Sequence, residues 1–402
     1  MFRLSQFMRD LVNPAPAMPH RAPPGPVVIW NLIRRCNLTC KHCYALSADK
    51  EFQGELSFFE IMTVMRDLKD FGVPALILSG GEPLLRPDIF DIAAGAREMG
   101  FYVGLSTNGT LIDDAMADRI EAARFNYVGI SIDGIGKVHD TFRRLDGAFD
   151  KSMGGIRRCH ERGVKVGLRY TMTQTNCDQL PGILELMNAE QVDKFYFSHL
   201  NYAGRGNHNR REDAFLSTTR DAMETLFESC LADVLAGRDR EWVTGNNDAD
   251  GAFFLMWAEK RFPDQAQLLR HKLVQWGGNS SGVNVANIDN LGDVHPDTMW
   301  WHYKLGNVRQ RPFSQIWQDV SDPLMAGLKQ SPRPVGGRCG QCRYLDICNG
   351  NTRVRAHQVS GDFWAEDPGC YLDDEEIGLT APQPRLAVTS FGDGPRVAGG
   401  QA

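Results

Sequence analysis

Six short runs rich in β-branched and aromatic residues alternate with helix-length segments between residues 27 and 202. The runs span residues 27–33, 75–81, 102–109, 127–134, 165–173 and 194–202. Strands that alternate with helices in this way form βα units and pair in parallel. Ser57, a common helix N-cap, and Gly72, a common stop, bound one of the intervening helices. The pattern predicts an α/β fold with a parallel sheet, either doubly wound or curved into a partial barrel.

The rest of the chain differs in composition from this alternating region. A polar, helix-rich stretch ends near residue 275, and residues 279–296, rich in Asn and Gly, predict a small hairpin. The N-terminus predicts a short amphipathic helix with a Pro-rich lead-in, and the Pro- and Gly-rich C-terminus predicts a disordered tail. We expect an N-terminal extension, a core, a helical linker, a small cysteine-rich domain and a tail, over residues 1–26, 27–235, 236–275, 276–380 and 381–402.

Charge and hydropathy argue against two classes of partner. The 402 residues include 44 basic and 50 acidic side chains, so the chain lacks the basic surplus that nucleic-acid binding needs. No apolar run approaches the length of about 18 residues that a membrane span requires. Arg3, Arg9 and Asp10 interrupt the apolar N-terminus, where a signal peptide would be continuous. These features predict a cytoplasmic protein, in which clustered cysteines more often bind metal than form disulfides.

Three of the ten cysteines, Cys36, Cys40 and Cys43, directly follow the first predicted strand. Loops at this end of an α/β sheet carry ligand-binding residues. A structural zinc site needs four ligands, and His42 is a poor fourth ligand because it is adjacent to Cys43. Three thiolates on one loop fit a [4Fe–4S] cluster whose fourth iron stays open to an exogenous ligand.

The C-x3-C-x2-C spacing, placed after the first strand of a βα array, resembles that of radical S-adenosylmethionine enzymes. Further motifs follow in the order typical of that family: SGGEP at 79–83, STNG at 106–109 and SIDG at 131–134. The resemblance covers about 27–235 and implies a partial (βα)6 barrel, similar to a TIM barrel. It also implies that S-adenosylmethionine binds the open iron. An electron from a donor such as flavodoxin or ferredoxin would then cleave it to a 5′-deoxyadenosyl radical.

The resemblance also implies which residues hold the cofactor. The glycines of SGGEP would let the backbone approach the methionine amine, Arg169 would pair with the methionine carboxylate, and the carbonyl of His42 would meet the adenine amine. Each motif alone is common in ordinary turns, so their order behind the cysteines carries the inference. The cofactor-binding candidates are His42, Gly80, Gly81, Glu82, Ser106, Asn108, Ser131, Asp133 and Arg169.

Four further cysteines form a C-x2-C-x5-C-x21-C pattern, which can saturate either zinc or a closed [4Fe–4S] cluster. They are Cys339, Cys342, Cys348 and Cys370. The pattern resembles the second auxiliary cluster of radical enzymes with the SPASM extension, which favours iron and sulfur. Where the full extension has further cysteines, this chain most nearly has Asn279, Asp297 and Thr352, so the resemblance implies one auxiliary cluster. The remaining cysteines are typical of small buried apolar residues, and they are Cys159, Cys177 and Cys230.

The whole chain most resembles the radical enzymes of haem d1 biosynthesis. The opening MFRLSQFMRDLVNPAP, the run PPGPVVIWNLIRRCNLTCKHCYA and the single auxiliary cluster carry this resemblance. The substrate in that branch is an iron tetrapyrrole, 12,18-didecarboxysiroheme. It loses two propionate side chains, and oxo groups take their place, which yields a haem d1 precursor.

Several segments could contact such a substrate, because a polycarboxylate macrocycle needs guanidinium groups and flat apolar walls. Segments 204–211 and 353–357 offer arginines, unless these are solvated surface charges. Segment 298–304 offers aromatic rings, unless these pack in the core. The candidate axial ligands of the substrate iron are His295, His302 and His357.

Three alternatives to this function stay open at the level of sequence. Other haem-modifying radical enzymes, which decarboxylate propionates, share the expected architecture. So do SPASM enzymes that modify peptides, although a peptide-binding domain would need more than the 26 residues of the N-terminal extension. A two-cluster electron carrier would be a different class of protein, and it would have no use for cofactor-binding motifs at the strand ends.

Overall fold

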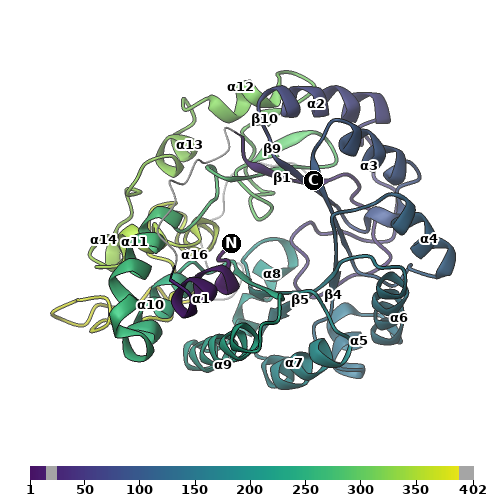
Figure 1. Ribbon diagram of the computed structural model, residues 1–402. Coiled ribbons are helices and arrows are strands. Elements are labelled where there is room, and N and C mark those ends of the chain that lie inside the picture. The colour runs from purple at the N-terminus through teal and green to yellow at the C-terminus, as the bar shows by residue number, and fades with distance from the viewer. Residues whose placement is uncertain (15–24, 389–402) are drawn as a thin grey trace.

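One sheet of ten strands organises the part of the chain that the computed structural model describes, residues 1–14 and 25–388. All six strands predicted from the sequence are present and pair in parallel in chain order. They are β1 (Val27–Asn31), β2 (Ala75–Ser79), β3 (Tyr102–Thr107), β4 (Tyr127–Ser131), β5 (Val166–Met172) and β6 (Lys194–His199). The sheet curves into a partial barrel (Figure 1), so the predicted α/β barrel is confirmed.

The sheet continues beyond the six predicted strands at both edges. β7 (Glu241–Gly245) pairs in parallel with β6, and β8 (Val285–Ile288) pairs in parallel with β1. The hairpin predicted at 279–296 is present, because β8 leads into antiparallel β9 (Asp293–His295), which pairs with β10 (Gly306–Asn307). The segment 236–275, for which the sequence predicts a helical linker, contains α10 (Ala249–Arg261) and α11 (Ala266–Trp276), and it also contains β7, which belongs to the barrel sheet.

Helices cover the outer face of the barrel sheet (Figure 1). Those of the βα units are α2 (Phe58–Asp70), α3 (Ile89–Glu98), α4 (Asp114–Ala122), α5 (Lys137–Arg143), α6 (Ala148–Glu161), α7 (Leu180–Ala189), α8 (Gly204–His208) and α9 (Leu216–Leu235). Later helices are α10 (Ala249–Arg261), α11 (Ala266–Trp276), α12 (Phe313–Gln318), α13 (Pro323–Leu328), α14 (Gly337–Gly340), α15 (Leu345–Cys348) and α16 (Arg353–Ser360). Across the described ranges, no helix combines the length and apolar character of a bilayer-crossing segment.

The first turn of α2 has the reciprocal hydrogen bonds of a capping box. Ser57 Oγ accepts from the Glu60 N–H at 3.3 Å, and Glu60 Oε2 accepts from the Ser57 N–H at 2.7 Å. These bonds satisfy two backbone donors that a helix start leaves without partners. Gly72 follows the helix with φ of 85°, a conformation that glycine adopts without strain. Both boundaries predicted for this helix are therefore confirmed.

Removing this cap should lower the stability of the fold by a small, measurable amount. Ser57→Ala leaves the Glu60 N–H without its side-chain acceptor, which we expect to cost about 1 kcal/mol of unfolding free energy. Thermal unfolding of the purified protein measures this change as a lower midpoint. Thr63→Ala, at an exposed position of the same helix, is the control. An equal shift in both variants would mean that the cap is not the cause.

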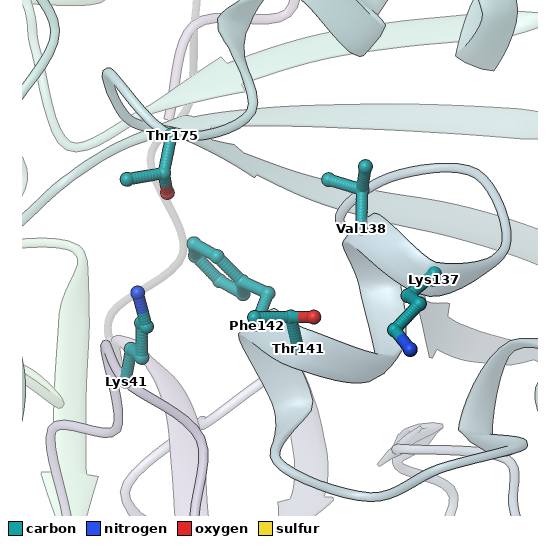
Figure 2. Close-up of a pocket in the computed structure, with 6 residues that line it drawn as sticks. All are labelled: Lys41, Lys137, Val138, Thr141, Phe142 and Thr175. Carbon is teal, nitrogen blue, oxygen red and sulfur yellow. The ribbon is translucent and has the colours of Figure 1, made fainter.

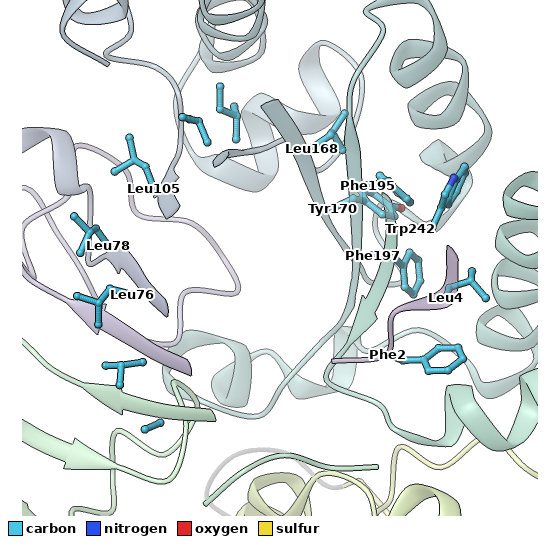
Figure 3. Close-up of a cluster of buried hydrophobic side chains, with 14 of the residues drawn as sticks. Phe2, Leu4, Leu76, Leu78, Leu105, Leu168, Tyr170, Phe195, Phe197 and Trp242 are labelled. Carbon is cyan, nitrogen blue, oxygen red and sulfur yellow. The ribbon is translucent and has the colours of Figure 1, made fainter. Parts of the chain in front are cut away.

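The hydrophobic core lies between the sheet and the outer helices. Leu76 and Leu78 of β2 and Leu168 of β5 are buried on the helix-facing side, and so are Phe195 and Phe197 of β6 (Figure 3). Side chains alternate across a strand, so every second residue faces the interior of the barrel instead. The outer face of the sheet, covered by amphipathic helices, therefore carries most of the apolar packing.

The inner face of the barrel is polar and sparsely filled. Cavity-lining residues on this face include Ser106, Ser131, Arg169 and Tyr196. Gly245 faces Tyr196, and a Cβ atom at this position would overlap the tyrosine hydroxyl. TIM barrels usually fill this space with layers of branched aliphatic side chains. The interior here keeps open space instead, which makes room for a ligand.

Both ends of the described chain contact other parts of the structure: the N-terminus contacts β7, and residues 381–388 contact the segment around Cys370. The predicted N-terminal helix is present as α1 (Leu4–Val12), and Phe2 pairs its backbone with Thr244 of β7. The Pro-rich lead-in and residues 389–402 of the predicted tail lie outside the described residues. Residues 381–388 differ from the prediction of disorder, because Arg385 donates to the carbonyls of Cys370 and Leu372 at 3.1 and 2.9 Å.

Candidate active site

The C-x3-C-x2-C cysteines share one loop between β1 and α2. Cys36 and Cys40 are buried and Cys43 is half-buried, and the three side chains form one small cluster. Arg205 of α8 fixes the loop from outside, since its Nε donates to the Cys40 carbonyl at 2.7 Å and its backbone N–H donates to the Cys43 carbonyl at 2.9 Å. The fold thus brings the three thiols together and holds the backbone that carries them.

Hydrogen-bond donors point at two of these sulfurs. The Leu38 N–H lies 3.4 Å from Cys36 Sγ, and Asn108 Nδ2 lies 3.9 Å from the same atom. Arg143 Nη1 lies 3.6 Å from Cys40 Sγ. Burial raises the pKa of both thiols, so an empty loop would hold them protonated. Donors aimed at sulfur stabilise thiolates, the form that binds iron, so the donor set fits a cluster at this loop.

His42 packs between the cysteines without joining their set. Its ring lies against Phe142 with the ring centres 4.7 Å apart, and its Nδ1 is buried without a partner among the described residues. Burial lowers the pKa of His42 to about 4, so the imidazole is neutral. His42 also lines the cavity described below, and the role of its carbonyl toward the cofactor stays a prediction.

The glycines of the SGGEP motif allow a close contact with the segment before the cysteines. A Cβ atom at Gly81 would overlap the Arg35 carbonyl, and one at Gly80 would overlap the Ile33 carbonyl. In this packing the Gly81 N–H donates to the Ile33 carbonyl at 2.6 Å. Both glycines also line the cavity. Their small size thus serves first to seat the SGGEP turn beside the cysteine loop.

Glu82 of the same motif is an internal acceptor. Its fully buried carboxylate accepts from Thr107 Oγ1 at 2.7 Å and from the Asn108 N–H at 2.8 Å. Burial raises the pKa of Glu82 to about 7, although these donors oppose the shift. Glu82 does not line the cavity. Its place in the structure therefore favours a role in joining the SGGEP and STNG turns over direct contact with a cofactor.

Ser106, Ser131 and Arg169 project from β3, β4 and β5 into the barrel and line the same cavity as the cysteines. Arg169 Nη1 donates to Ser106 Oγ, and its guanidinium lies 5.1 Å from the ring centre of Tyr196. In the described part of the chain no carboxylate forms an ion pair with Arg169, so this charge can pair with an anionic ligand group.

Asp133 of the SIDG motif does not line the cavity, although its partner Arg143 does. It is fully buried and pairs with the Arg143 guanidinium, and its Oδ1 accepts from the Thr171 N–H at 2.7 Å. Burial would raise the pKa of this carboxyl, but Arg143 lowers it below its usual value. The position favours a role for Asp133 behind the cysteine loop over the expected direct contact with the cofactor.

A cavity of about 620 Å³ joins the cysteine loop to the barrel interior. The cysteines and the SGGEP turn form one side, and the ends of β6 and β7 form another. Cavities that bind small molecules usually measure about 300–1,000 Å³. The volume and the position over the carboxyl ends of parallel strands fit a small-molecule active site.

Residues from beyond the barrel complete the cavity wall. Asn279, Asp297 and Thr352, which stand where the SPASM extension would have further cysteines, all line it. Asp248 lies beside them and accepts from Asn279 Nδ2 at 2.7 Å. Burial raises the pKa of both Asp248 and Asp297. These positions therefore form a polar wall that faces the cysteine loop across the cavity.

The four C-terminal cysteines form a second cluster of thiols. Electrostatic coupling links Cys348 to all three others, and burial raises the pKa of each. Cys348 is buried and the other three are half-buried, and the Tyr344 N–H donates to Cys342 Sγ at 3.3 Å. Four thiols gathered at one place, with a backbone donor on one of them, fit a site that binds a metal or an iron–sulfur cluster.

The arginines expected to bind substrate carboxylates instead brace the fold. Arg205 holds the cysteine loop, and Arg210 donates to Asn207 and to the Gln358 carbonyl, both at 3.1 Å. Arg355 pairs with Asp367 and donates to backbone carbonyls. None of the arginines in segments 204–211 and 353–357 lines the cavity. The sequence shows their charge but not their partners, which come from distant segments.

The histidines proposed as axial ligands also lie away from the cavity. His295 is buried with its Nδ1 on the Tyr303 carbonyl at 2.8 Å, and His302 pairs with His357 at 3.2 Å near the surface. In the aromatic segment 298–304, Trp300 is in the core, whereas Met299 lines the cavity. Core packing is therefore the role of Trp300, while Thr298 and Met299 of the same segment line the cavity.

His199 is a cavity residue that the sequence did not single out. It ends β6, and its Nε2 lies 3.1 Å from an oxygen of the fully buried Asp250. Tyr371, which follows Cys370, donates to the same carboxylate at 2.7 Å. A lone His at a strand end gives no signal by itself, because its carboxylate partner is 51 residues away.

The family model described as the radical SAM superfamily matches residues 30–187. The chain is 53% identical over 393 residues to the pre-heme d1 synthase of Dinoroseobacter shibae, and the match covers 97% of each protein. The chain belongs to the radical SAM superfamily. This radical SAM protein is also 45% identical over 356 residues to the Fe-coproporphyrin III synthase of Methanosarcina barkeri, covering 88% of this chain and 89% of that protein.

Comparison with solved structures agrees with the fold of this radical SAM protein. SuiB of Streptococcus suis, solved with S-adenosylmethionine bound, superposes with a TM-score of 0.68 at 18% identity. The match covers 87% of this chain and 78% of SuiB. At this identity the likeness establishes the fold alone.

Membership of the superfamily implies a [4Fe–4S] cluster and S-adenosylmethionine, and the residues fit both. The three thiols and their donors suit the cluster, as shown above. Arg169, unpaired with any described carboxylate, suits the methionine carboxylate, and the cavity joins it to the cysteines. The chain is thus a radical SAM enzyme, and its three loop cysteines line the cavity.

Proposed function

We propose that this radical SAM enzyme converts 12,18-didecarboxysiroheme into a haem d1 precursor, removing two propionate side chains and introducing oxo groups. The observation that carries the proposal is the 53% identity to pre-heme d1 synthase over 97% of both chains. Such coverage includes the barrel, the polar wall and all four C-terminal cysteines. The residues that face a substrate are thus within the matched region.

The cavity supports a macrocyclic, polycarboxylate substrate. Its wall combines flat or flexible apolar groups, Tyr44, Tyr196 and Met299, with the cationic Arg169. Asn279 and Ser281 add polar side chains to this wall and can form hydrogen bonds with polar groups of a substrate. A guanidinium and polar side chains beside flat apolar groups match the surface of an iron tetrapyrrole.

The chain's own residues bind, orient and shield the reacting groups. When bound, the cluster and S-adenosylmethionine supply a 5′-deoxyadenosyl radical that abstracts hydrogen. Cys36, Cys40 and Cys43 hold the cluster, and Arg169 orients the methionine carboxylate. The barrel interior encloses the target carbon and excludes water, which protects a radical from side reactions.

We also propose that Cys339, Cys342, Cys348 and Cys370 hold a second, closed [4Fe–4S] cluster. The mutual proximity of the four thiols and the Tyr344 N–H donor on Cys342 support this assignment, and the polar residues Asn279, Asp297 and Thr352 stand where a further auxiliary cluster would need cysteines. A flavodoxin or ferredoxin is the electron donor that the family resemblance favours. Zinc in place of iron at these four cysteines would contradict the assignment.

A second candidate function is formation of another iron tetrapyrrole, as in Fe-coproporphyrin III synthase. The 45% identity over 88% of this chain favours it. We rank this candidate second, because the match to pre-heme d1 synthase has higher identity and coverage. The two reactions differ in the side chains that they leave on the macrocycle, so product mass separates them.

The proposed reaction has a direct test. We expect the reconstituted full chain, incubated anaerobically with 12,18-didecarboxysiroheme, a reductant and S-adenosylmethionine, to form 5′-deoxyadenosine and a tetrapyrrole that lacks two propionates. Mass spectrometry of the macrocycle measures the change. Deoxyadenosine formed beside an intact macrocycle would mean another substrate, and a product that keeps both propionates would favour the second candidate. A reaction with Cys36→Ala is the control for chemistry without the cluster.

A further inference from the structure

Arg143 ends α5, and its side chain lies against the cysteine loop, where it also lines the cavity. Its side chain is 9% exposed, and its guanidinium both donates to Cys40 Sγ at 3.6 Å and pairs with Asp133. Asp133 is fully buried, and its backbone N–H donates to His139 Nδ1 at 3.0 Å. A carboxylate, a guanidinium and a cluster-binding sulfur therefore form one continuous buried chain of contacts.

The backbone around Arg143 is fixed against the loop. The Lys41 N–H donates to the Phe142 carbonyl at 3.1 Å, and the Phe142 ring packs on His42. Lys41 and Phe142 also line a pocket of about 220 Å³, and Figure 2 shows the Phe142 ring near Lys41. Because residue 142 is held on the loop, the next side chain has little freedom to leave Cys40.

The charges of Arg143 and Asp133 act in opposite directions on the reduction potential of an iron–sulfur cluster bound at Cys40. A guanidinium keeps its charge at every accessible pH, and Asp133 further favours that charge in the buried setting. Reduction adds negative charge to the cluster, so a cation and an N–H donor at a ligand sulfur favour the reduced state. A buried carboxylate nearby disfavours it. Low local dielectric makes both effects larger than they would be at the surface.

We propose that Arg143 and Asp133 are positioning residues that set the reduction potential of the cluster at Cys36, Cys40 and Cys43. Arg143, which the Lys41–Phe142 backbone hydrogen bond keeps beside the loop, raises the potential through the Cys40 sulfur, and Asp133 lowers it through its own buried charge. The proposal rests on the cluster that the superfamily holds and is independent of the tetrapyrrole substrate. It also gives the SIDG aspartate a function that does not need contact with the cofactor.

The test is a redox titration of the anaerobically reconstituted full chain without substrate. Electron paramagnetic resonance detects the reduced cluster at each potential. We expect the midpoint potential of the three-cysteine cluster to become more negative in Arg143→Met and more positive in Asp133→Asn. The second cluster should keep its potential in both variants. Arg144→Met removes an equal charge from the adjacent, exposed residue, and solvent screening should leave the potential nearly unchanged.

Opposite signs are the decisive outcome, because general damage to the loop would move both variants the same way. Shifts of equal sign, or no shift in either variant, would overturn the proposal. If Arg143→Met does not assemble the cluster, Arg143→Lys keeps the charge and a single donor, and its potential should lie below that of the unaltered protein. An unshifted Arg143→Lys together with an unshifted Asp133→Asn would also overturn it. Absence of the second cluster would contradict the proposed function and leave this sign comparison intact.

Discussion

Replacing Cys40 with alanine is expected to abolish cleavage of S-adenosylmethionine while the C-terminal cysteines stay loaded. Cys40 supplies one of three sulfurs at the loop and is also the sulfur that Arg143 contacts. Two thiolates leave an iron without a protein ligand, so the loop cluster should be lost. Iron should then fall from about eight to about four atoms per chain. Iron and sulfide analysis and an assay for 5′-deoxyadenosine measure the two effects.

Cys159→Ala is the matched control for this prediction. Cys159 is a buried cysteine of α6 and belongs to neither set, so its removal should leave both iron content and cleavage unchanged. Loss of all iron in Cys40→Ala would contradict the two-site arrangement, since it would mean that the C-terminal cysteines cannot assemble a cluster alone.

Replacing Cys348 with alanine should separate cofactor cleavage from product formation. Cys348 lies at the centre of the C-terminal set, where its sulfur is coupled to the other three. The loop cysteines line the cavity and the four C-terminal cysteines do not, so deoxyadenosine should still form. Product should fall by a larger factor, because the second cluster is lost. The ratio of deoxyadenosine to modified tetrapyrrole in one incubation measures this uncoupling.

Cys230→Ala, at a buried position of α9 away from both sets, is the comparison for Cys348→Ala and should keep the original ratio. An unchanged ratio in Cys348→Ala would mean that the C-terminal set has no part in the chemistry. Equal loss of cofactor cleavage and of product would instead mean that the C-terminal cysteines are also needed for cleavage of S-adenosylmethionine.

The strands and the cysteine sets could be predicted because their signals are local. The apolar runs of β1 to β6 and the spacing of Cys36, Cys40 and Cys43 are visible within single segments. The strand β7 was missed, because five residues, EWVTG, between helices give little periodicity, and pairing with β6 depends on residues about 50 positions earlier. Edge strands of this kind form through tertiary contacts more than through their own propensity.

Side-chain roles at the site were harder to predict than side-chain positions. Asp133 and Glu82 occur at the expected strand ends, yet each is committed to partners from other turns. Arg355 and Arg205 are charged residues in polar segments, which in sequence suggests exposed ligand-binding groups. Their carbonyl and carboxylate partners lie 12 to 165 residues away. Long-range partners of this kind leave no trace in a single segment, whatever its motif.

The division of the barrel into an apolar outside and a polar inside separates two demands on the sequence. Folding free energy comes mainly from the helix-facing residues such as Leu76, Leu168 and Phe197. Ligand fit depends on inward residues such as Ser131 and Arg169, which contribute little apolar burial. Inward positions can therefore change without loss of the scaffold. A few interior substitutions could therefore adapt such a barrel to bind a different macrocycle. Related proteins could then share the fold and differ in which side chains of the tetrapyrrole they remove.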